Sequence, residues 1–359
     1  MYNFLRGERV LERRVSRQVN VGGVKIGGGA DISVQSMLNV PAHDIKAGVA
    51  QALELQNAGC DIIRAAVPDK ESVKLIAALK ESVDAPIVAD IHFDYRLALE
   101  CASAGVDKIR INPGNIGSED NIKKVAVCCA NRGIPIRIGI NSGSLEKSVL
   151  QKYGAPTAEA LFESGMYHAR LLEKFDFHDI VLSLKASDVK QMFEAYSFAA
   201  KRCDYPLHLG VTEAGTERMG ILKSAAGIGG LLLSGIGDTI RVSLTDAPVK
   251  EVRAGIDLLR SLGMRKGGVH FVSCPTCGRT KIDLINLAKK AEEALAGCTK
   301  DITVAVMGCV VNGPGEAREA DIGIAGGDGC GLIFKKGEIF KKVPEEKLLD
   351  ELLKEIEML

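Results

Sequence analysis

Three cysteines and a glutamate near the C-terminal end have the types and spacing of metal ligands. Cys274 and Cys277 form a Cys-x-x-Cys loop, whose two thiolates can reach one metal ion or one face of a cluster. Cys309 follows the apolar run 302–306, so we expect it at the end of a strand. Glu316 follows Asn-Gly-Pro-Gly, a loop without stiff side chains that lets its carboxylate turn back to the same centre. We therefore predict one metal site held by Cys274, Cys277, Cys309 and Glu316.

This ligand set leaves two kinds of centre open. An iron–sulfur cluster held by three thiolates and a carboxylate would be reactive, because the carboxylate is the ligand most easily exchanged for a substrate oxygen. The alternative is a structural zinc site, in which Cys298 or Cys330 completes a set of four thiolates and Glu316 is only solvated. The remaining cysteines are expected to pack in the core, and they are Cys60, Cys101, Cys128, Cys129 and Cys203.

Composition excludes several classes of protein. The 359 residues carry 46 Lys and Arg against 46 Asp and Glu, so no global charge points to nucleic acid or to an anionic membrane. No apolar signal segment opens the chain, and no later stretch approaches the ~18 uninterrupted apolar residues of a membrane helix. Ten cysteines without a secretion signal favour reduced thiols and metal chemistry over disulfides. We expect a soluble, cytoplasmic protein.

From residue 32 to about residue 262 the chain repeats one pattern eight times: a short apolar strand, a loop, and a helix with apolar residues at three-and-four spacing. Eight such units predict an α/β fold of the TIM (β/α)8 barrel type. A doubly wound sheet is less favoured, because no G-x-G-x-x-G follows the first strand. The expected strands are Ser33–Met37, Ile62–Ala66, Pro86–Asp90, Val106–Ile111, Pro135–Ile140, Ile180–Leu184, Leu207–Thr212 and Thr239–Leu244.

Segments on both sides of the barrel have their own patterns. Val19–Ile26 alternates around Gly-Gly and predicts a hairpin that plugs the bottom of the barrel. The basic run Arg13–Arg17 before it is interpreted as a solvated arm. A glycine-rich, basic stretch at 263–268 predicts a hinge. We therefore predict two domains, the barrel at 1–262 and a small α/β domain at 263–359 that carries the metal ligands. The elements expected in the second domain are strands 269–273, 302–306, 322–325 and 332–335 and helices 281–296 and 344–358.

Polar side chains follow the barrel strands at their carboxyl ends, where barrel enzymes have their active sites. The cations among them are Arg64, Arg110, Arg137, Lys185 and Arg241. The other polar residues are Asp90, His92, Asn112, Asn141, Glu213 and Ser243. Converging cations predict a strongly anionic ligand, most simply a diphosphate, because arginine binds phosphate through two parallel hydrogen bonds. For any single cation, a salt bridge across the barrel rim is the other interpretation.

Some of these residues allow more than one role. Lys185 could form a Schiff base, but we interpret it as an anion ligand, because a phosphate keeps an amine charged. Glu213 is the first carboxylate after the seventh strand and could donate a proton or bind substrate hydroxyls. His92 could be a general acid or a hydrogen-bonded structural residue. The loop 142–157 is either a lid or dimer contact, or a variable surface excursion.

Taken together, the two halves resemble the 4-hydroxy-3-methylbut-2-enyl diphosphate synthases, the iron–sulfur enzymes of the non-mevalonate isoprenoid pathway, in their shorter bacterial two-domain form. The resemblance covers nearly the whole chain, and the segments that carry it are Val34–Met37, Ile109–Asn115, Arg137–Leu145, Ser273–Arg279 and Met307–Glu316. One departure is Leu38-Asn39-Val40, where the family pattern has Thr-Asn-Thr.

The resemblance implies that Cys274, Cys277, Cys309 and Glu316 hold a 4Fe-4S cluster, and that the barrel binds 2-C-methyl-D-erythritol 2,4-cyclodiphosphate. The implied reaction is a two-electron reductive ring opening with loss of water, which gives 4-hydroxy-3-methylbut-2-enyl diphosphate. Flavodoxin or ferredoxin is the implied electron donor. The implied diphosphate ligands are Arg64, Arg110, Arg137, Asn141, Lys185, Arg241 and Ser243, with Glu213 near the carbon skeleton.

The resemblance further implies a homodimer in which the cluster domain of one subunit covers the barrel of the other. The alternative from another class is a non-redox phosphosugar-binding or sensor barrel with a structural zinc on Cys274, Cys277, Cys309 and Cys330.

Overall fold

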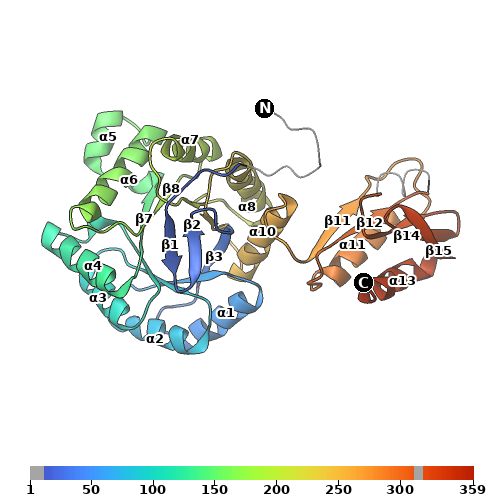
Figure 1. Cartoon of the computed structure of the whole chain (residues 1–359), viewed down its shortest axis with the longest axis horizontal. Coiled ribbons are helices and arrows are strands. Elements are labelled where there is room, and N and C mark those ends of the chain that lie inside the picture. The colour runs from blue at the N-terminus through green and yellow to red at the C-terminus, as the bar shows by residue number, and fades with distance from the viewer. Residues whose placement is uncertain (1–11, 311–317) are drawn as a thin grey trace. The chain divides into compact units, whose positions relative to one another are not determined.

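The computed structural model describes residues 12–310 and 318–359. It divides into two compact units, of which the first ends at Arg265 and the second begins at Lys266 (Figure 1). This division falls inside the glycine-rich, basic stretch at 263–268. No helix among the described residues has the length and apolar character needed to cross a membrane.

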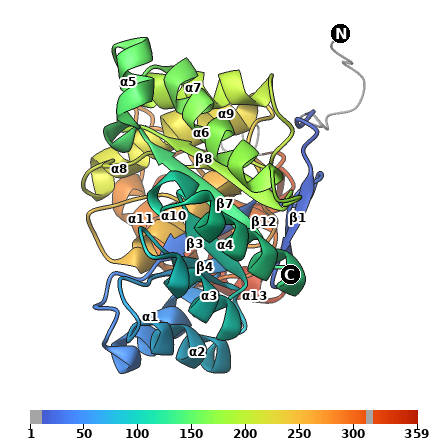
Figure 2. The ribbon, with the colours of Figure 1, turned by 90° about the vertical axis from the view of Figure 1, so that its left-hand side faces the viewer.

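The first unit is a parallel barrel, which confirms the predicted fold class. Its eight strands lie in the order β8-β7-β6-β5-β4-β3-β10-β9, and a bridge between Leu182 and Leu207 joins the two ends of this order. Figure 1 looks along the barrel, with helices ringing the strands, and Figure 2 shows it from the side. The strands are β3 (Ser33–Met37), β4 (Ile62–Ala66), β5 (Ile87–Asp90), β6 (Lys108–Ile111), β7 (Ile136–Asn141), β8 (Ile180–Lys185), β9 (His208–Leu209) and β10 (Thr239–Ile240).

Amphipathic helices of the barrel pack against its strands. Asp44, Asp94 and Asp188 accept a backbone hydrogen bond at the start of three of these helices, as N-cap aspartates do. The loop predicted at 142–157 contains a helix of its own, α5. The helices are α1 (Ile45–Asn57), α2 (Val73–Ser82), α3 (Tyr95–Ser103), α4 (Glu119–Arg132), α5 (Lys147–Tyr153), α6 (Ala158–Glu173), α7 (Val189–Ala200), α8 (Glu217–Ser224), α9 (Gly230–Leu233) and α10 (Pro248–Ser261).

The last two strands of the barrel are shorter than predicted. The ladder between them covers two residue pairs, and Arg241 N adds one bond to Leu209 O beyond it. Beyond this point the chain leaves the ladder, and Leu244 N donates to the side chain of Glu251 on α10. The residues beyond β10 are therefore shaped by α10 and not by sheet pairing.

The predicted hairpin is present as β1 (Gln18–Val21) and β2 (Val24–Gly27). Its apolar side chains Val19, Val21 and Ile26 are buried against residues of three barrel strands, namely Ile62, Val88 and Val181. Figure 2 shows the hairpin at one end of the barrel. The prediction that it plugs the bottom of the barrel is confirmed.

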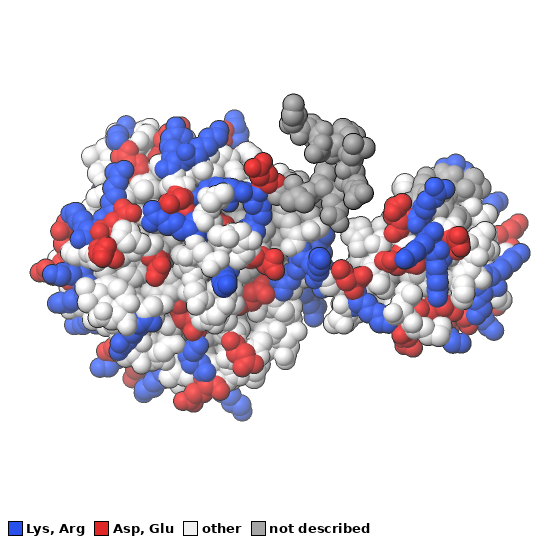
Figure 3. Space-filling view, in the orientation of Figure 1, with Lys and Arg blue, Asp and Glu red and all other residues white. Residues whose placement is uncertain are grey.

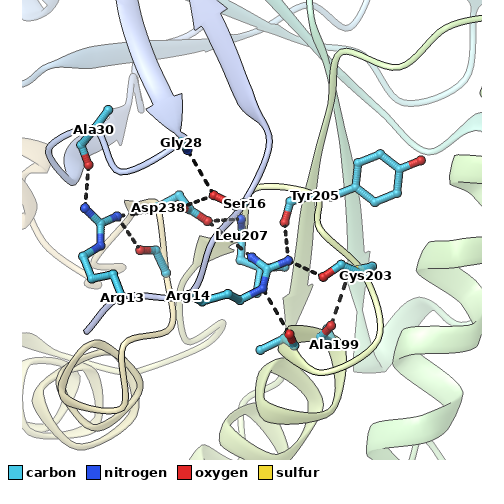
Figure 4. A network of polar contacts seen from close by, with 12 residues as sticks. Arg13, Arg14, Ser16, Gly28, Ala30, Ala199, Cys203, Tyr205, Leu207 and Asp238 are labelled. Carbon is cyan, nitrogen blue, oxygen red and sulfur yellow. Dashed lines mark hydrogen bonds and ion pairs between the residues drawn. The ribbon is translucent and has the colours of Figure 1, made fainter. Parts of the chain in front are cut away.

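The interpretation of the basic run as a solvated arm is wrong. Arg13 donates to the carbonyl oxygens of Ala30 and Gly237, and Arg14 donates to those of Ala200, Cys203 and Tyr205 (Figure 4). Both guanidinium groups also lie within 3.7 Å of the buried carboxylate of Asp238. Only Val15, at 89% exposed, faces the solvent fully. These partners are distant in sequence, so the run itself carries no sign of them.

The second unit is a five-stranded sheet in the order β11-β12-β13-β14-β15. Its first three strands are parallel and the last two antiparallel. Two helices, α11 (Leu284–Leu295) and α13 (Leu348–Glu357), share one apolar core with the sheet. The strands are β11 (Val269–Ser273), β12 (Ile302–Met307), β13 (Ile322–Gly326), β14 (Cys330–Lys335) and β15 (Glu338–Pro344).

The last strand, β15, was not predicted. Its first five residues are all exposed, so the sequence shows no alternation of buried and exposed positions that would predict a strand. It is an edge strand, paired only with β14 among the described residues. Charges of both signs are mixed over the face of the molecule drawn in Figure 3.

Candidate functional site

The register of the barrel strands brings the predicted side chains into the barrel interior. Asp90 on β5 lies beside Arg110 on β6, and Arg110 lies beside Arg137 on β7. On the next pair, Asn141 on β7 lies beside Lys185 on β8. Residues that are neighbours across adjacent strands point to the same face of a sheet. These side chains therefore point into the barrel. Asp90, Asn141 and Lys185 end their strands at its carboxyl end, which we call the mouth. Arg137 was expected at the end of its strand, but it is the second residue of β7 and lies deeper in the barrel.

Asp90 is the centre of one half of the mouth. Its carboxylate is 1% exposed and accepts from Arg64 Nη2 at 2.5 Å and from Arg110 Nη1 at 3.1 Å. His92 Nε2 lies 3.3 Å from the same carboxylate, and the His92 side chain is half exposed at 53%. Burial alone would raise the pKa of Asp90, but Arg64, His92 and Arg110 outweigh it and hold this pKa well below its ordinary value. The carboxylate is therefore ionised and orients three basic side chains.

Arg241 is held on the other side of the mouth by Glu251, a buried residue of α10. Arg241 Nε and Nη2 donate to the two carboxylate oxygens of Glu251 at 3.2 and 3.1 Å, in the fork arrangement typical of arginine. Glu251 also accepts from Ser36 Oγ at 2.9 Å. The third nitrogen, Arg241 Nη1, donates to Ser243 Oγ at 2.8 Å. Arg241 and Ser243 are thus placed as a pair.

Three more cations lie inside the barrel and find fewer partners. Arg137 Nε and Nη2 and Lys108 Nζ are buried, and no described residue accepts a hydrogen bond from them. Burial, and then the nearby positive charges, lower the pKa values of Arg137 and Lys108 well below their ordinary range. The pKa of Lys185 is lowered in the same way, first by burial and then by Arg241 and Arg137. These groups lack the negative charge that would keep them ionised at low cost.

The charge balance of the barrel interior favours an anionic ligand. Two carboxylates, Asp90 and Glu251, face six cations among the described residues. The six are Arg64, Lys108, Arg110, Arg137, Lys185 and Arg241. All five cations predicted from the sequence are therefore brought together, and two of them, Arg137 and Lys185, have no carboxylate in hydrogen-bonding contact. Rim salt bridges account for Arg64, Arg110 and Arg241 only.

The remaining predicted residues of the mouth differ in their surroundings. Asn112 is buried, and its Oδ1 has no partner among the described residues. Asn141 ends β7 and is partly exposed. Glu213 is exposed, follows β9, and has a positive φ of 51°, which is uncommon outside glycine. A side chain at Gly139 would lie 2.6 Å from Arg110 Nε, so this glycine makes room for the guanidinium group.

In the second unit, Cys274 and Cys309 lie near the carboxyl ends of two neighbouring strands. Cys274 directly follows β11 and Cys309 follows β12, and these parallel strands are neighbours with Ser273 beside Val306. Gly308 N lies 3.2 Å from Cys274 Sγ and donates to it, so this thiol already reaches the residue before Cys309. Cys277 is exposed, and hydrogen bonds from the backbone and side chain of Arg279 lower its pKa. A lower pKa favours the thiolate, which is the form that binds metals.

The fold separates the two cysteines proposed as alternative ligands. Cys298 follows α11 and precedes β12, so it lies near the amino end of that strand, away from Cys274 and Cys309. Cys330 begins β14, which runs antiparallel to β13. It therefore lies at the same end of the sheet as Cys274 and Cys309. Within residues 12–310 and 318–359, no three His, Cys, Asp or Glu side chains are close enough to hold a metal ion as they stand. Glu316 lies outside the described residues.

Three residues of the barrel interior were missed by the sequence analysis. Lys108 precedes Arg110 by two positions in one strand, so alternation along the strand could have identified it. His208 is fully buried on β9, and neither ring nitrogen has a partner among the described residues. Glu251 lies on the buried face of an amphipathic helix. A buried charge on such a face was the available signal, but its partner Arg241 could not be identified without the fold.

Comparison with known proteins matches both units to one family. The family model described as the GcpE TIM-barrel domain matches residues 16–256, and that of the GcpE protein C-terminal domain matches residues 270–358. A protein of Clostridium perfringens named 4-hydroxy-3-methylbut-2-en-1-yl diphosphate synthase (flavodoxin) is 58% identical over 97% of this chain and 99% of its own length. One of the same name from Caldanaerobacter subterraneus is 60% identical over 96% of this chain and 97% of its own.

Among solved structures, a type I 3-dehydroquinate dehydratase of Clostridium difficile aligns with a TM-score of 0.51 at 16% identity. The alignment covers 69% of this chain and 98% of that one. A truncated 3-deoxy-D-arabino-heptulosonate 7-phosphate synthase of Thermotoga maritima aligns with a TM-score of 0.50 at 16% identity, over 69% of this chain and 94% of that one. At this identity, these likenesses concern the barrel fold alone.

Proposed function

Because the chain belongs to the GcpE family, we propose that it converts 2-C-methyl-D-erythritol 2,4-cyclodiphosphate to 4-hydroxy-3-methylbut-2-enyl diphosphate by reductive ring opening and loss of water. It is an oxidoreductase of isoprenoid biosynthesis. The single observation of the structure that best supports this substrate is the excess of cations in the barrel interior, where six face the two buried carboxylates of Asp90 and Glu251. A cyclic diphosphate supplies the missing negative charge.

The residues of the mouth divide into two groups in this proposal. Arg137 and Lys185 bind the diphosphate oxygens directly, because no carboxylate of the barrel occupies them. Arg64, Arg110 and Arg241 also face the diphosphate, each held in one orientation by a buried carboxylate. The amide groups of Asn112 and Asn141 and the hydroxyl of Ser243 complete the set. Such fixed donors bind an anion without the cost of ordering them.

Glu213 and His92 are proposed to face the carbon skeleton. Both are more exposed than the cations, and each follows the end of a strand. His92 already shares the carboxylate of Asp90 with Arg64 and Arg110, so substrate that engages these arginines brings its ring close to the imidazole. Replacing Glu213 by Gln is expected to lower kcat more than it raises KM, because a proton donor acts on the chemical step.

The cofactor of this proposal is a 4Fe-4S cluster held by Cys274, Cys277, Cys309 and Glu316. The cluster, when bound, would pass electrons from the donor protein to the substrate one at a time, two for each turnover. The chemistry of the donor set fits: Cys274 and Cys309 follow neighbouring strand ends, and Cys277 is an exposed thiol of lowered pKa. Flavodoxin is the proposed donor of electrons to the cluster, as the names of the relatives indicate, and ferredoxin is the other candidate.

Anaerobic purification tests the cofactor. We expect a brown protein with about four iron atoms per chain and a broad visible band that dithionite bleaches. A colourless protein with one zinc ion would support the alternative, a non-redox barrel with zinc on Cys274, Cys277, Cys309 and Cys330. The variant Glu316→Cys is expected to keep the colour and lose most turnover; unchanged turnover would contradict the role of Glu316 as an exchangeable ligand.

A mixed dimer tests the proposed assembly, in which the cluster domain of one subunit acts on the barrel of the other. One subunit carries Arg137→Met in the barrel, and its partner carries Cys277→Ser in the cluster domain. If the domains act between subunits, the mixed dimer has one intact barrel served by one intact cluster domain, and activity returns. If each chain serves itself, every site of the mixed dimer is defective and activity stays absent.

A further inference from the structure

His168 is a fully buried residue that none of the roles above uses. It lies on α6, which packs against β7 and against the short 3-10 turn Pro113–Asn115 that follows β6. This turn begins directly after Asn112. The loop after β7 begins with Asn141 and reaches Glu146 at the start of α5. His168 therefore lies beneath two loops that each carry an asparagine of the mouth.

The two ring nitrogens of His168 contact one loop each. Gly114 N donates to Nδ1 at 3.2 Å, and Nε2 makes a very short hydrogen bond with Glu146 Oε1. Because Nδ1 accepts from a backbone N–H, the proton of the neutral ring is on Nε2, which donates to Glu146. Ser164, one turn earlier on α6, donates to the other oxygen of Glu146 at 2.8 Å. Each loop is thus anchored to α6 through the same imidazole.

Gly114 packs directly against the imidazole ring of His168. A Cβ added at Gly114 would lie 2.5 Å from Cε1 of His168, so no other residue fits there without moving the loop. On the other side, burial would raise the pKa of Glu146, but hydrogen bonds from His168 and Ser164 outweigh it and lower this pKa to about 2. Glu146 is therefore ionised at neutral pH and remains an acceptor.

We infer that His168 is a positioning residue for substrate binding, which fixes the spacing between the loops of Asn112 and Asn141. It does not touch the substrate. The buried Oδ1 of Asn112 is an acceptor without a partner among the described residues, as expected of a group that accepts from a hydroxyl of the substrate. The inference rests on the proposed function, because it assumes that both amides face one substrate. Without His168, each loop would move separately and the two amides would no longer match one ligand.

Three replacements of His168 test this inference in the holoenzyme. His168→Asn keeps an acceptor at the position of Nδ1, His168→Gln keeps a donor near the position of Nε2, and His168→Leu keeps neither. We expect KM for the cyclic diphosphate to rise about tenfold or more in the Leu variant and by less in the other two. The value of kcat at saturating substrate and the visible spectrum should change by less than about twofold. A purely structural role would instead reduce the folded fraction, which lowers apparent kcat and leaves KM unchanged.

Two further variants complete the experiment. His178→Gln is the matched control, because His178 pairs with Asp176 at the surface just before β8, at the end of the barrel opposite the mouth. Its KM should equal that of the wild type. Gly114→Ala leaves His168 unchanged but pushes the same loop off the ring, so KM should rise even if His168→Leu fails to fold.

The outcomes separate the inference from the proposed function. A wild-type protein that does not turn over the cyclic diphosphate overturns the proposed function and the inference with it. A wild-type enzyme that is active, with folded His168 and Gly114 variants of unchanged KM, overturns the inference alone.

Discussion

Replacement of Glu251 by Gln should destabilise the barrel, because it removes the charge opposite a largely buried arginine. Glu251 is 3% exposed and accepts four hydrogen bonds, from two nitrogens of Arg241, from Ser36 Oγ and from Leu244 N. Glutamine keeps the shape but loses the charge and one acceptor oxygen. Breaking a buried ion pair on one side costs about 3–5 kcal/mol, and we expect about 3 kcal/mol here because Arg241 keeps some exposure to water.

For a unit of this size, such a loss lowers the Tm by roughly 6–12 °C. Thermal unfolding followed by circular dichroism measures it. The matched control is Glu217→Gln, which removes an exposed partner of Lys250, the residue next to Glu251. An exposed pair contributes little, so the control should unfold within about 2 °C of the wild type. If Glu251→Gln shifted the Tm no more than the control does, the buried pair would not stabilise the barrel and the reasoning would be refuted.

The remaining predictions concern protonation and exposure. Glu146 has its pKa lowered to about 2, against about 4.3 unfolded, so it stabilises the fold above pH ~4.3 and this contribution is lost as the pH falls toward 2. Glu146→Gln should therefore lower the free energy of unfolding by about 2 kcal/mol at pH 7, after allowance for solvent screening, and the difference should vanish in urea titrations near pH 2. Lys108→Met removes a buried cation that has no acceptor among the described residues. The Tm should therefore rise by a few °C, while KM for the cyclic diphosphate increases. A lower Tm would contradict this account. In cluster-free protein, iodoacetamide at pH 8 should alkylate Cys277, which is exposed with a lowered pKa, before Cys60, whose pKa burial raises to about 12; mass spectrometry of the peptides decides the order.

The strands of the barrel could be predicted from sequence because their signal is local. Apolar runs with a polar residue at the end mark each strand, and the register then brings Asp90, Arg110 and Arg137 side by side. The same alternation contained Lys108, two positions before Arg110, although its burial below the mouth was not expected. A rule that follows the inward face of each strand, two residues at a time, would have included it.

What could not be predicted depends on contacts between distant parts of the chain. Arg13 and Arg14 lie in a run that looks solvated in the sequence. Apart from Ala30, however, their partners are carbonyl oxygens and the carboxylate of Asp238 that lie 186 to 225 residues away. The strand Glu338–Pro344 has no apolar alternation, because it is an edge strand that pairs through its backbone. His168 looks like any histidine of an amphipathic helix until the fold brings two loops onto its ring.

The arginines of the mouth are alike in sequence, but their neighbours give them different tasks. Arg241 is bound through a fork to Glu251, and such a residue loses little freedom when a ligand arrives. Arg137 has two nitrogens without an acceptor among the described residues, so a ligand that binds it removes a cost that the empty barrel carries. Residue type and strand position can therefore predict both arginines as site residues. Only the placement of Glu251 and Asp90 distinguishes the arginines that the protein holds in place from those that it leaves for the substrate.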